Sequence, residues 1–142
     1  MNNLSDFNLS GKKVLVRVDF NVPLNDEYTI TDDTRMKAAM PTIQHIIENE
    51  GIAILMSHLG RPDNGAEEKF SLKHLVKHLE TLTKTKIHFA SNCIGDGAKK
   101  SVEKAAKGEI VLLENLRFHS EEKKGNEDFA SQLASLGDIY VN

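Results

Sequence analysis

Arginine is the residue type in this sequence whose placement most directly suggests chemistry. The chain has 18 lysines and arginines together, and its four arginines are Arg17, Arg35, Arg61 and Arg117. Each arginine falls at or near the end of a short apolar run, or where the following loop leads into a helical pattern. A guanidinium is a rigid, always-charged fork that binds phosphate or carboxylate oxygens two at a time. The arginines therefore predict a site for a small ligand that carries several negative charges.

Two simpler explanations of the arginine placement stay open. Loops make up about 40% of an average chain, so a few arginines can fall in loops by chance. Arginines in loops also form structural ion pairs. Arg17 is interpreted as structural, because its position within an apolar run points it toward a neighbouring element.

Polar residues beside the arginines suggest how a ligand would be oriented. Asp19 and Asn21 flank Phe20 just after the first apolar run. Both types are common turn residues, but Pro23 and the apolar flanks favour a fixed loop, in which two polar side chains can face one ligand hydroxyl or carboxylate. His58 precedes a glycine and an arginine, and for this histidine both contact with an anion and a structural role stay open.

The other motifs are weaker. His74 and His78 have the one-turn spacing of a helical metal pair but no convincing third ligand, so we interpret them as solvated helix surface and expect no metal site. Cys93 is the only cysteine and cannot form an intramolecular disulfide, which fits a reducing compartment. The glycines at 60–65 and 95–97 lack the rest of a phosphate loop or a dinucleotide fingerprint, so no nucleotide-binding motif is present.

Length and composition are those of one ordinary domain, which we expect to span residues 1–142. The chain has 142 residues, 39% of them hydrophobic and 27% charged, and a net charge of −3. Its apolar runs are too short for a membrane helix, its start does not resemble a secretion signal, and its basic residues are spread out. We therefore expect a cytoplasmic protein without nucleic acid or membrane as its main partner.

Short apolar runs alternate with helical patterns along the chain. The apolar runs lack polar alternation, so each predicts a strand covered on both faces: 14–18, 52–56, 86–89, 110–113 and 138–141. The helical patterns cover about 36–47, 71–82, 96–107 and 129–136. Pro41 predicts a kink or a restart in the first helix, and Ser71 is the predicted N-cap of the second.

This alternation predicts a Rossmann-like three-layer α/β/α domain with a mostly parallel sheet. Ligands of such sheets bind outside the carboxyl ends of the strands. Three loops fall there: 17–23 with 31–35, 57–62 and 114–119. The last run has no closing turn or helix, so we expect a chain truncated within or just after its last strand.

Four strings in these loops resemble one family, phosphoglycerate kinase. They are VLVRVDFNVPL (14–24), ITDDTR (30–35), MSHLGRP (56–62) and LLENLRFH (112–119), in the order and spacing of that family. The resemblance covers essentially the whole chain. It implies the N-terminal, substrate-binding half of an enzyme that transfers a phosphoryl group between 1,3-bisphosphoglycerate and ADP.

The resemblance also implies roles for individual residues. Asp19 and Asn21 would contact the glycerate end of the substrate, and Arg35 would be the catalytic residue beside the transferring phosphoryl group. The non-transferring phosphate would be held by side chains of His58, Arg61 and Arg117, with the backbone of Phe20, Leu59 and Gly60.

The family pattern extends beyond this sequence. It continues with a further phosphate-binding arginine, another strand and a C-terminal domain that binds Mg-ATP or Mg-ADP. We therefore expect the chain alone to be inactive, to bind 3-phosphoglycerate weakly at most, and to lack a nucleotide site, whereas the whole enzyme is expected to be monomeric. A non-catalytic module that binds a phosphorylated metabolite, and a purely structural fragment, stay open as alternatives.

Overall fold

A computed structural model describes residues 8–59, 70–92, 94–118 and 127–141, apart from the side chains of residues 117, 128 and 129. These residues form one sheet of five strands in the order β3-β4-β2-β1-β5. Every pairing in it is parallel. The strands are β1 (Lys13–Arg17), β2 (Ile52–Met56), β3 (Ile87–Ala90), β4 (Ile110–Leu113) and β5 (Ile139–Val141).

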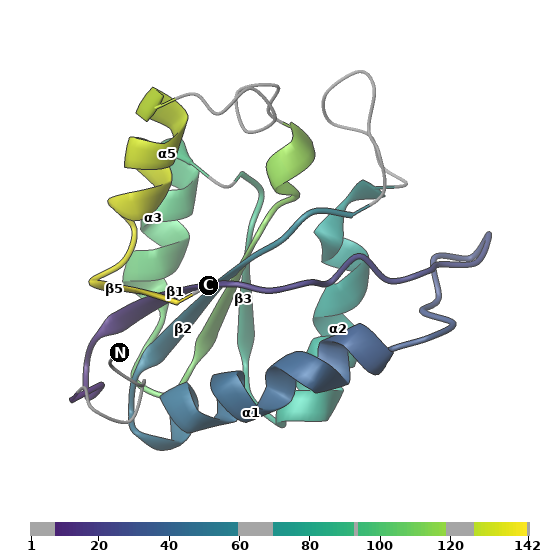
Figure 1. Ribbon diagram of the computed structural model, residues 1–142, viewed down its shortest axis with the longest axis horizontal. Helices are drawn as coiled ribbons and strands as arrows, with labels where there is room; N and C mark the ends of the chain where they lie inside the picture. Colours follow the sequence, from purple (N-terminus) through teal and green to yellow (C-terminus); the bar gives the residue numbers. More distant parts are fainter. Residues whose placement is uncertain (1–7, 60–69, 93, 119–126, 142) are drawn as a thin grey trace.

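Helices cover both faces of the sheet, which confirms the predicted α/β class. Figure 1 shows α1 and α2 on one face and α3 and α5 on the other. They are α1 (Thr34–Glu48), α2 (Val76–Thr83), α3 (Gly95–Lys104) and α5 (Glu127–Ala134). Two short 3₁₀ turns complete the described elements: η3 (Leu72–Leu75), which runs into α2, and η4 (Leu116–Phe118), which follows β4.

Two hydrophobic cores lie on opposite faces of the sheet because successive strand residues point to opposite faces. Val14 and Val16 of β1 pack in the core that contains Met36, Ile43 and Ile46 of α1. Leu15, between them in sequence, packs in the second core with Ala98 and Val102 of α3. Both faces of β1 are therefore apolar, which explains why the strand shows no polar alternation.

The predicted burial of the strands holds for the two central strands β2 and β4 and not for the edge strand β5. Every residue of β2 and of β4 is buried. In β5 no residue is fully buried, and Tyr140 is 55% exposed. The reason is that β5 pairs only with β1 among the described residues.

The helices differ from the sequence prediction most clearly in α1 and α3, while the bounds of the others differ by a few residues. No restart occurs at Pro41, because α1 is one helix from Thr34 to Glu48. Pro41 is exposed, and it removes only one intrahelical hydrogen bond. The predicted helix over 96–107 ends earlier, at Lys104, where Ala105 has an extended backbone.

The strand order places a switch point between β2 and β4, which are neighbours in the sheet. The chain leaving β2 goes to η3 and α2 on one face, whereas the chain leaving β4 goes to α5 on the other face. The chain thus turns to opposite faces after these two strands, and open α/β sheets bind ligands outside the carboxyl ends of the strands at such a point.

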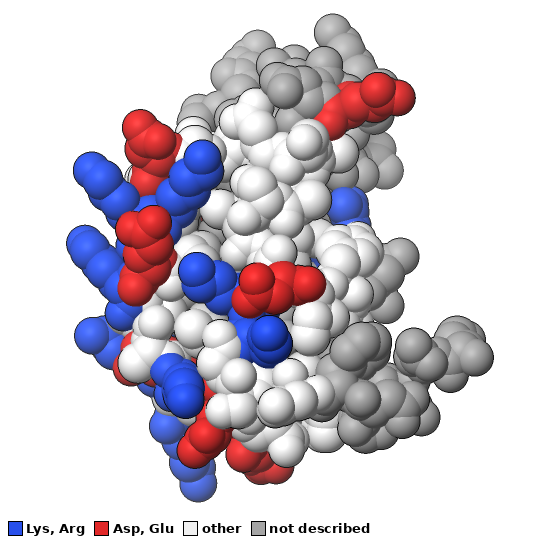
Figure 2. All heavy atoms as spheres, turned by 90° about the vertical axis from the view of Figure 1, so that its left-hand side faces the viewer, with Lys and Arg blue, Asp and Glu red and all other residues white. Residues whose placement is uncertain are grey.

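The outer surface of α3 carries charges of both signs. Its exposed residues include Asp96, Lys99, Lys100, Glu103 and Lys104. Figure 2, a view of the side of the molecule where α3, α5 and β5 lie, shows basic and acidic side chains interspersed. The lysines of α3 are thus mixed with carboxylates, as on a solvated helix face. No helix in the described part of the chain is long and apolar enough to cross a membrane.

Candidate functional site

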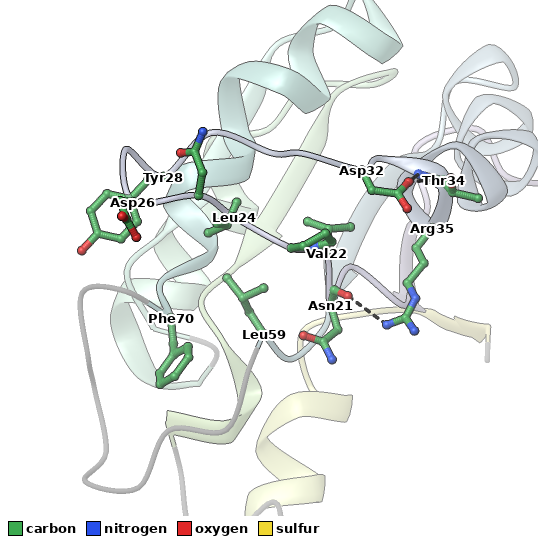
Figure 3. Close-up of a pocket in the computed structure, with 12 residues that line it drawn as sticks. Asn21, Val22, Leu24, Asp26, Tyr28, Asp32, Thr34, Arg35, Leu59 and Phe70 are labelled. Carbon is green, nitrogen blue, oxygen red and sulfur yellow. Dashed lines mark hydrogen bonds between the residues drawn. The ribbon is translucent and has the colours of Figure 1, made fainter.

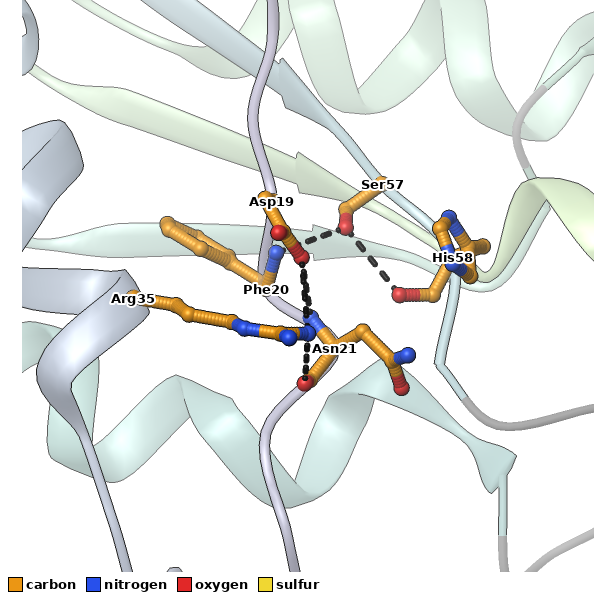
Figure 4. Close-up of polar contacts among 6 residues, drawn as sticks. All are labelled: Asp19, Phe20, Asn21, Arg35, Ser57 and His58. Atoms are coloured by element: carbon orange, nitrogen blue, oxygen red, sulfur yellow. Dashed lines mark hydrogen bonds and ion pairs between the residues drawn. The ribbon is translucent and has the colours of Figure 1, made fainter.

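The loop after β1 and the first turn of α1 meet through Arg35. Its Nη1 donates a hydrogen bond to the backbone carbonyl of Asn21 at 2.8 Å and lies 3.5 Å from Asp19 Oδ1. Figure 4 shows the guanidinium extending from α1 to this loop. The side chains of Arg35 and Asp19 are 54% and 62% exposed, so both remain accessible to a ligand.

The 19–21 loop is fixed by its middle residue. Phe20 is fully buried in the core on the α1 side of the sheet. The Asp19 carboxylate accepts a hydrogen bond from the Asn21 N–H at 3.2 Å, a local turn that short polar side chains favour. Asp19 is exposed and Asn21 half-buried, because the buried ring between them holds the backbone against the core.

The N-terminus of α1 already carries two carboxylates. Asp32 accepts hydrogen bonds from the Thr34 hydroxyl at 2.6 Å and the Thr34 N–H at 3.0 Å, and these bonds lower the pKa of Asp32. Asp33 lies 2.8 Å from His78 Nε2, and this hydrogen bond is the main reason why the pKa of Asp33 is lowered. Arg35 therefore stands among negative charges that hold the first turn in place.

A hollow of about 900 Å³ opens beside this cluster. Figure 3 shows Asn21 and Arg35 at one end of it and Tyr28 and Phe70 toward the other. Leu59 contributes to the wall between them. The hollow thus joins a polar end, which offers a guanidinium and an amide, to a mainly apolar wall.

The loop after β2 contacts both the 19–21 loop and the loop after β4. The Phe20 N–H donates to the Ser57 hydroxyl at 2.9 Å, and the Leu116 N–H donates to the Ser57 carbonyl at 3.0 Å. His58 is half-buried and Leu59 is buried. The backbone of η4, which includes Arg117, therefore begins against the end of β2.

The structure brings together most of the predicted site residues that it describes. Asp19, Asn21 and Arg35 are in direct contact. Phe20 is joined to Ser57, the residue before His58 and Leu59. Gly60, Arg61 and Cys93 lie outside the described residues, as does the side chain of Arg117.

Two buried polar residues at the site were missed by the sequence reasoning. Ser57 and Asn115 are 1% and 0% exposed, and both form hydrogen bonds between loops. A usable signal existed, because each stands within two residues of the end of a fully buried strand.

The two helical histidines lie at the surface, as interpreted, but both are half-buried and both have partners. The ring of His74 stacks on Tyr28, with ring centroids 4.1 Å apart, and His78 pairs with Asp33. Both histidines thus connect the second helical segment to the 24–33 region. Within the described ranges, no group of three His, Cys, Asp or Glu side chains could hold a metal ion.

Comparison with known proteins identifies the family. The family model described as phosphoglycerate kinase matches residues 4–142. The chain belongs to the phosphoglycerate kinase family. Among its relatives, phosphoglycerate kinase of Prochlorococcus marinus is 50% identical over 142 residues, and that of Chlorobium limicola is 51% identical over 139 residues. These alignments cover 100% and 98% of this chain but only 35% of each relative.

Solved structures of the family share the fold. Phosphoglycerate kinase from Pyrococcus horikoshii matches with a TM-score of 0.87 and 30% identity, over 100% of this chain and 36% of that one. The enzyme from Coxiella burnetii matches with a TM-score of 0.82 and 32% identity, over 98% of this chain and 34% of that one. The chain therefore spans about a third of the length of these family members.

Proposed function

We propose that this chain is the phosphoglycerate-binding part of a phosphoglycerate kinase, a glycolytic phosphotransferase that acts in the cytoplasm. The observation that carries the proposal is the contact of Arg35 with the 19–21 loop, beside the loops that leave β2 and β4 at the switch point. This arrangement offers a guanidinium, an amide and a carboxylate to one small anionic ligand. Family membership supports the choice of 3-phosphoglycerate and 1,3-bisphosphoglycerate as that ligand.

Each residue has a role in this proposal that the resemblance to phosphoglycerate kinases implies. Asp19 accepts from a substrate hydroxyl and Asn21 binds the glycerate end. Arg35 stabilises the charge of the phosphoryl group being transferred. The non-transferring phosphate is held by His58, Arg61 and Arg117, together with the backbone of Phe20, Leu59 and Gly60.

The proposed reaction moves a phosphoryl group from the acyl phosphate of 1,3-bisphosphoglycerate to ADP, which yields 3-phosphoglycerate and ATP, and it is reversible. Positioning and neutralisation of charge on the phosphoryl oxygens supply most of the rate in such transfers. The relatives are about three times as long as this chain, and the proposal assigns the Mg-nucleotide to a C-terminal domain outside residues 1–142, in an enzyme that acts as a monomer.

Isothermal titration calorimetry of the 142-residue chain tests the binding role. We expect weak, saturable binding of 3-phosphoglycerate and no comparable binding of glycerate, which lacks the phosphate. Binding of inorganic sulfate with the same affinity as 3-phosphoglycerate, or no binding of either, would count against a phosphoglycerate site.

A coupled assay tests the division of labour. The chain alone is expected to form no ATP from ADP and 1,3-bisphosphoglycerate, since the proposal places the nucleotide site elsewhere. ATP formation by the purified chain would overturn that assignment.

A further inference from the structure

Ser57 links the loop after β1 to the loop after β2. Its hydroxyl accepts the Phe20 N–H at 2.9 Å and donates to the His58 carbonyl at 3.1 Å. Figure 4 shows both bonds, with Arg35 on the other side of the 19–21 loop. Because Ser57 is 1% exposed, water cannot readily replace it as the partner of the buried Phe20 N–H.

Asn115 makes the corresponding link from the loop after β4. Its Nδ2 donates to the carbonyl of Leu59 at 2.8 Å and to that of Phe70 at 2.9 Å. The side chain is fully buried, and its neighbour Leu116 donates a backbone N–H to Ser57. One amide group thus holds two backbone carbonyls that are eleven positions apart in sequence.

These bonds form a continuous path across the switch point. It runs from Asn115 to Leu59, through His58 to the Ser57 hydroxyl, and from there to Phe20, between Asp19 and Asn21. Buried polar groups of this kind impose one geometry, since each lost partner leaves a costly unpaired donor or acceptor. The apolar cores on the two faces, being non-directional, do not fix the loops in this way.

We propose that Ser57 and Asn115 are positioning residues of the phosphoglycerate site. Their hydrogen bonds set how the 19–21 loop, the 57–59 loop and the start of η4 stand relative to one another. Neither residue needs to touch the substrate. This inference rests on the proposed function for its ligand, but the hydrogen-bonded path itself does not depend on that function.

The test compares the 142-residue chain with its Ser57→Ala and Asn115→Asp variants. Ser57→Ala removes the acceptor of the Phe20 N–H, and Asn115→Asp places a carboxylate where an amide donated to two carbonyls. Thr83→Val is the matched control: Thr83 is 5% exposed and its hydroxyl donates to the Leu79 carbonyl at 2.8 Å. This hydrogen bond lies in the last turn of α2, shortly before β3 begins. It is therefore near the amino ends of the strands, away from the carboxyl ends where the site lies.

Affinity for 3-phosphoglycerate, measured by calorimetry on folded protein, is the first readout. We expect each site variant to weaken binding about tenfold, since small displacements of positioned groups have large effects. The control loses a similar buried hydrogen bond but should keep the wild-type affinity. Unchanged affinity in a folded site variant would overturn the proposal, as would an equal loss in the control. If Asn115→Asp does not fold, Ser57→Ala decides alone.

Amide NMR without ligand is the second readout, and it separates this inference from the proposed function. Asn115→Asp should shift the amide resonances of Phe20 and Asn21, which the hydrogen-bonded path joins to Asn115. Shifts confined to residues around the substitution would overturn the positioning role. If wild-type protein binds no 3-phosphoglycerate, the proposed function fails, and the ligand-free shifts still decide whether the path couples the loops.

Discussion

Arg35 is held by the backbone carbonyl of Asn21 at 2.8 Å, and the carboxylate of Asp19 is farther, at 3.5 Å. A carbonyl orients the guanidinium without neutralising it, so the positive charge stays available to a ligand. The exposed ion pair with Asp19 adds little stability, as is usual for surface pairs. This geometry is suited to stabilising charge that develops on a phosphoryl group.

Replacement of Arg35 by alanine should lower turnover more than it weakens substrate binding. In an enzyme that joins this chain to a nucleotide-binding domain, we expect kcat to fall about 10²–10³-fold, the usual cost of losing one preorganised donor. Lys37→Ala, the control, removes the same charge two positions along α1 and should leave kcat unchanged. Steady-state kinetics that show an unchanged kcat and only a raised KM would contradict the catalytic role.

Asp33 should give the protein a defined pH dependence. Its pKa is lowered from the ordinary value of 3.8, mainly by the hydrogen bond with His78 and further by Lys37. A lowered folded pKa means that the carboxylate stabilises the fold above the unfolded pKa, and that this contribution is lost as the pH falls through the folded value. Asp33→Asn should therefore reduce the free energy of unfolding at pH 7, and the difference should shrink as the pH falls below about 3.8 and disappear below the lowered pKa of folded Asp33.

Urea unfolding of wild type and Asp33→Asn between pH 7 and pH 2.5 measures this difference. In a His78→Gln background the effect of Asp33→Asn should be smaller, because the main partner is gone. A difference that stays constant across the whole pH range would show that the carboxylate does not act through its charge.

Some of the site could be predicted from sequence at this scale, and some could not. Asp19, Asn21 and Arg35 were predictable because they follow strands or open a helix, and parallel strands bring such positions to one edge. The places of Ser57 and Asn115 at strand ends were a signal, but the links that they make were not predictable, because the partners of a buried polar side chain depend on which loops the fold places together. The pairing of His74 with Tyr28 was missed for the same reason.

At the scale of elements, Glu114 fixes the start of η3 from across the switch point. Its carboxylate accepts the Ser71 hydroxyl at 2.6 Å and the Leu72 N–H at 2.8 Å. The predicted N-cap, Ser71, is confirmed, since it accepts the Lys73 N–H. Sequence reasoning found the local cap but not the residue from the loop after β4 that supports it.

Glu114→Ala should destabilise the fold by about 1–3 kcal/mol, the usual cost of leaving buried polar groups without a partner. Glu103→Ala is the control, because Glu103 is exposed on α3, and it should change stability by less than about 0.5 kcal/mol. Chemical denaturation measures both. Equal, small changes would mean that Glu114 does not hold η3.

Two glycines should respond to alanine in opposite directions. A Cβ at Gly137 would lie 2.9 Å from the Cβ of Leu15 and 3.3 Å from backbone atoms of β1. The backbone between α5 and β5 could then not lie as close to β1. Gly97, inside α3, has nothing within 4 Å of its Cβ position. Gly137→Ala should lower the free energy of unfolding by about 1–3 kcal/mol. Gly97→Ala should raise it by about 0.5–1 kcal/mol, because alanine has a higher helix propensity than glycine.

Thermal or urea unfolding of the two alanine variants decides this prediction. Destabilisation by Gly97→Ala would show that α3 is constrained in a way its open surroundings do not reveal. A neutral Gly137→Ala would show that the approach to β1 is less tight than the geometry indicates.

At the scale of the whole molecule, the order of strands determines the site. The alternation of apolar runs with helical patterns in the sequence predicted a parallel sheet with helices on both faces. The apolar runs show no alternation of polar and apolar residues, as in strands that are covered on both faces, and parallel strands are joined by crossover connections. It did not predict the order β3-β4-β2-β1-β5, which depends on long-range pairing. That order places the divergence of the loops between β2 and β4, next to the loop of β1.

The central claim is that the carboxyl edge of the sheet binds a phosphorylated three-carbon acid. Amide NMR of the 142-residue chain, titrated with 3-phosphoglycerate, tests it at residue resolution. We expect saturable shifts at residues 19–21, 35, 57–59 and 115–117, and none along α3 or at the amino ends of the strands. The absence of shifts at the carboxyl edge, or shifts centred on the lysines of α3, would contradict the claim.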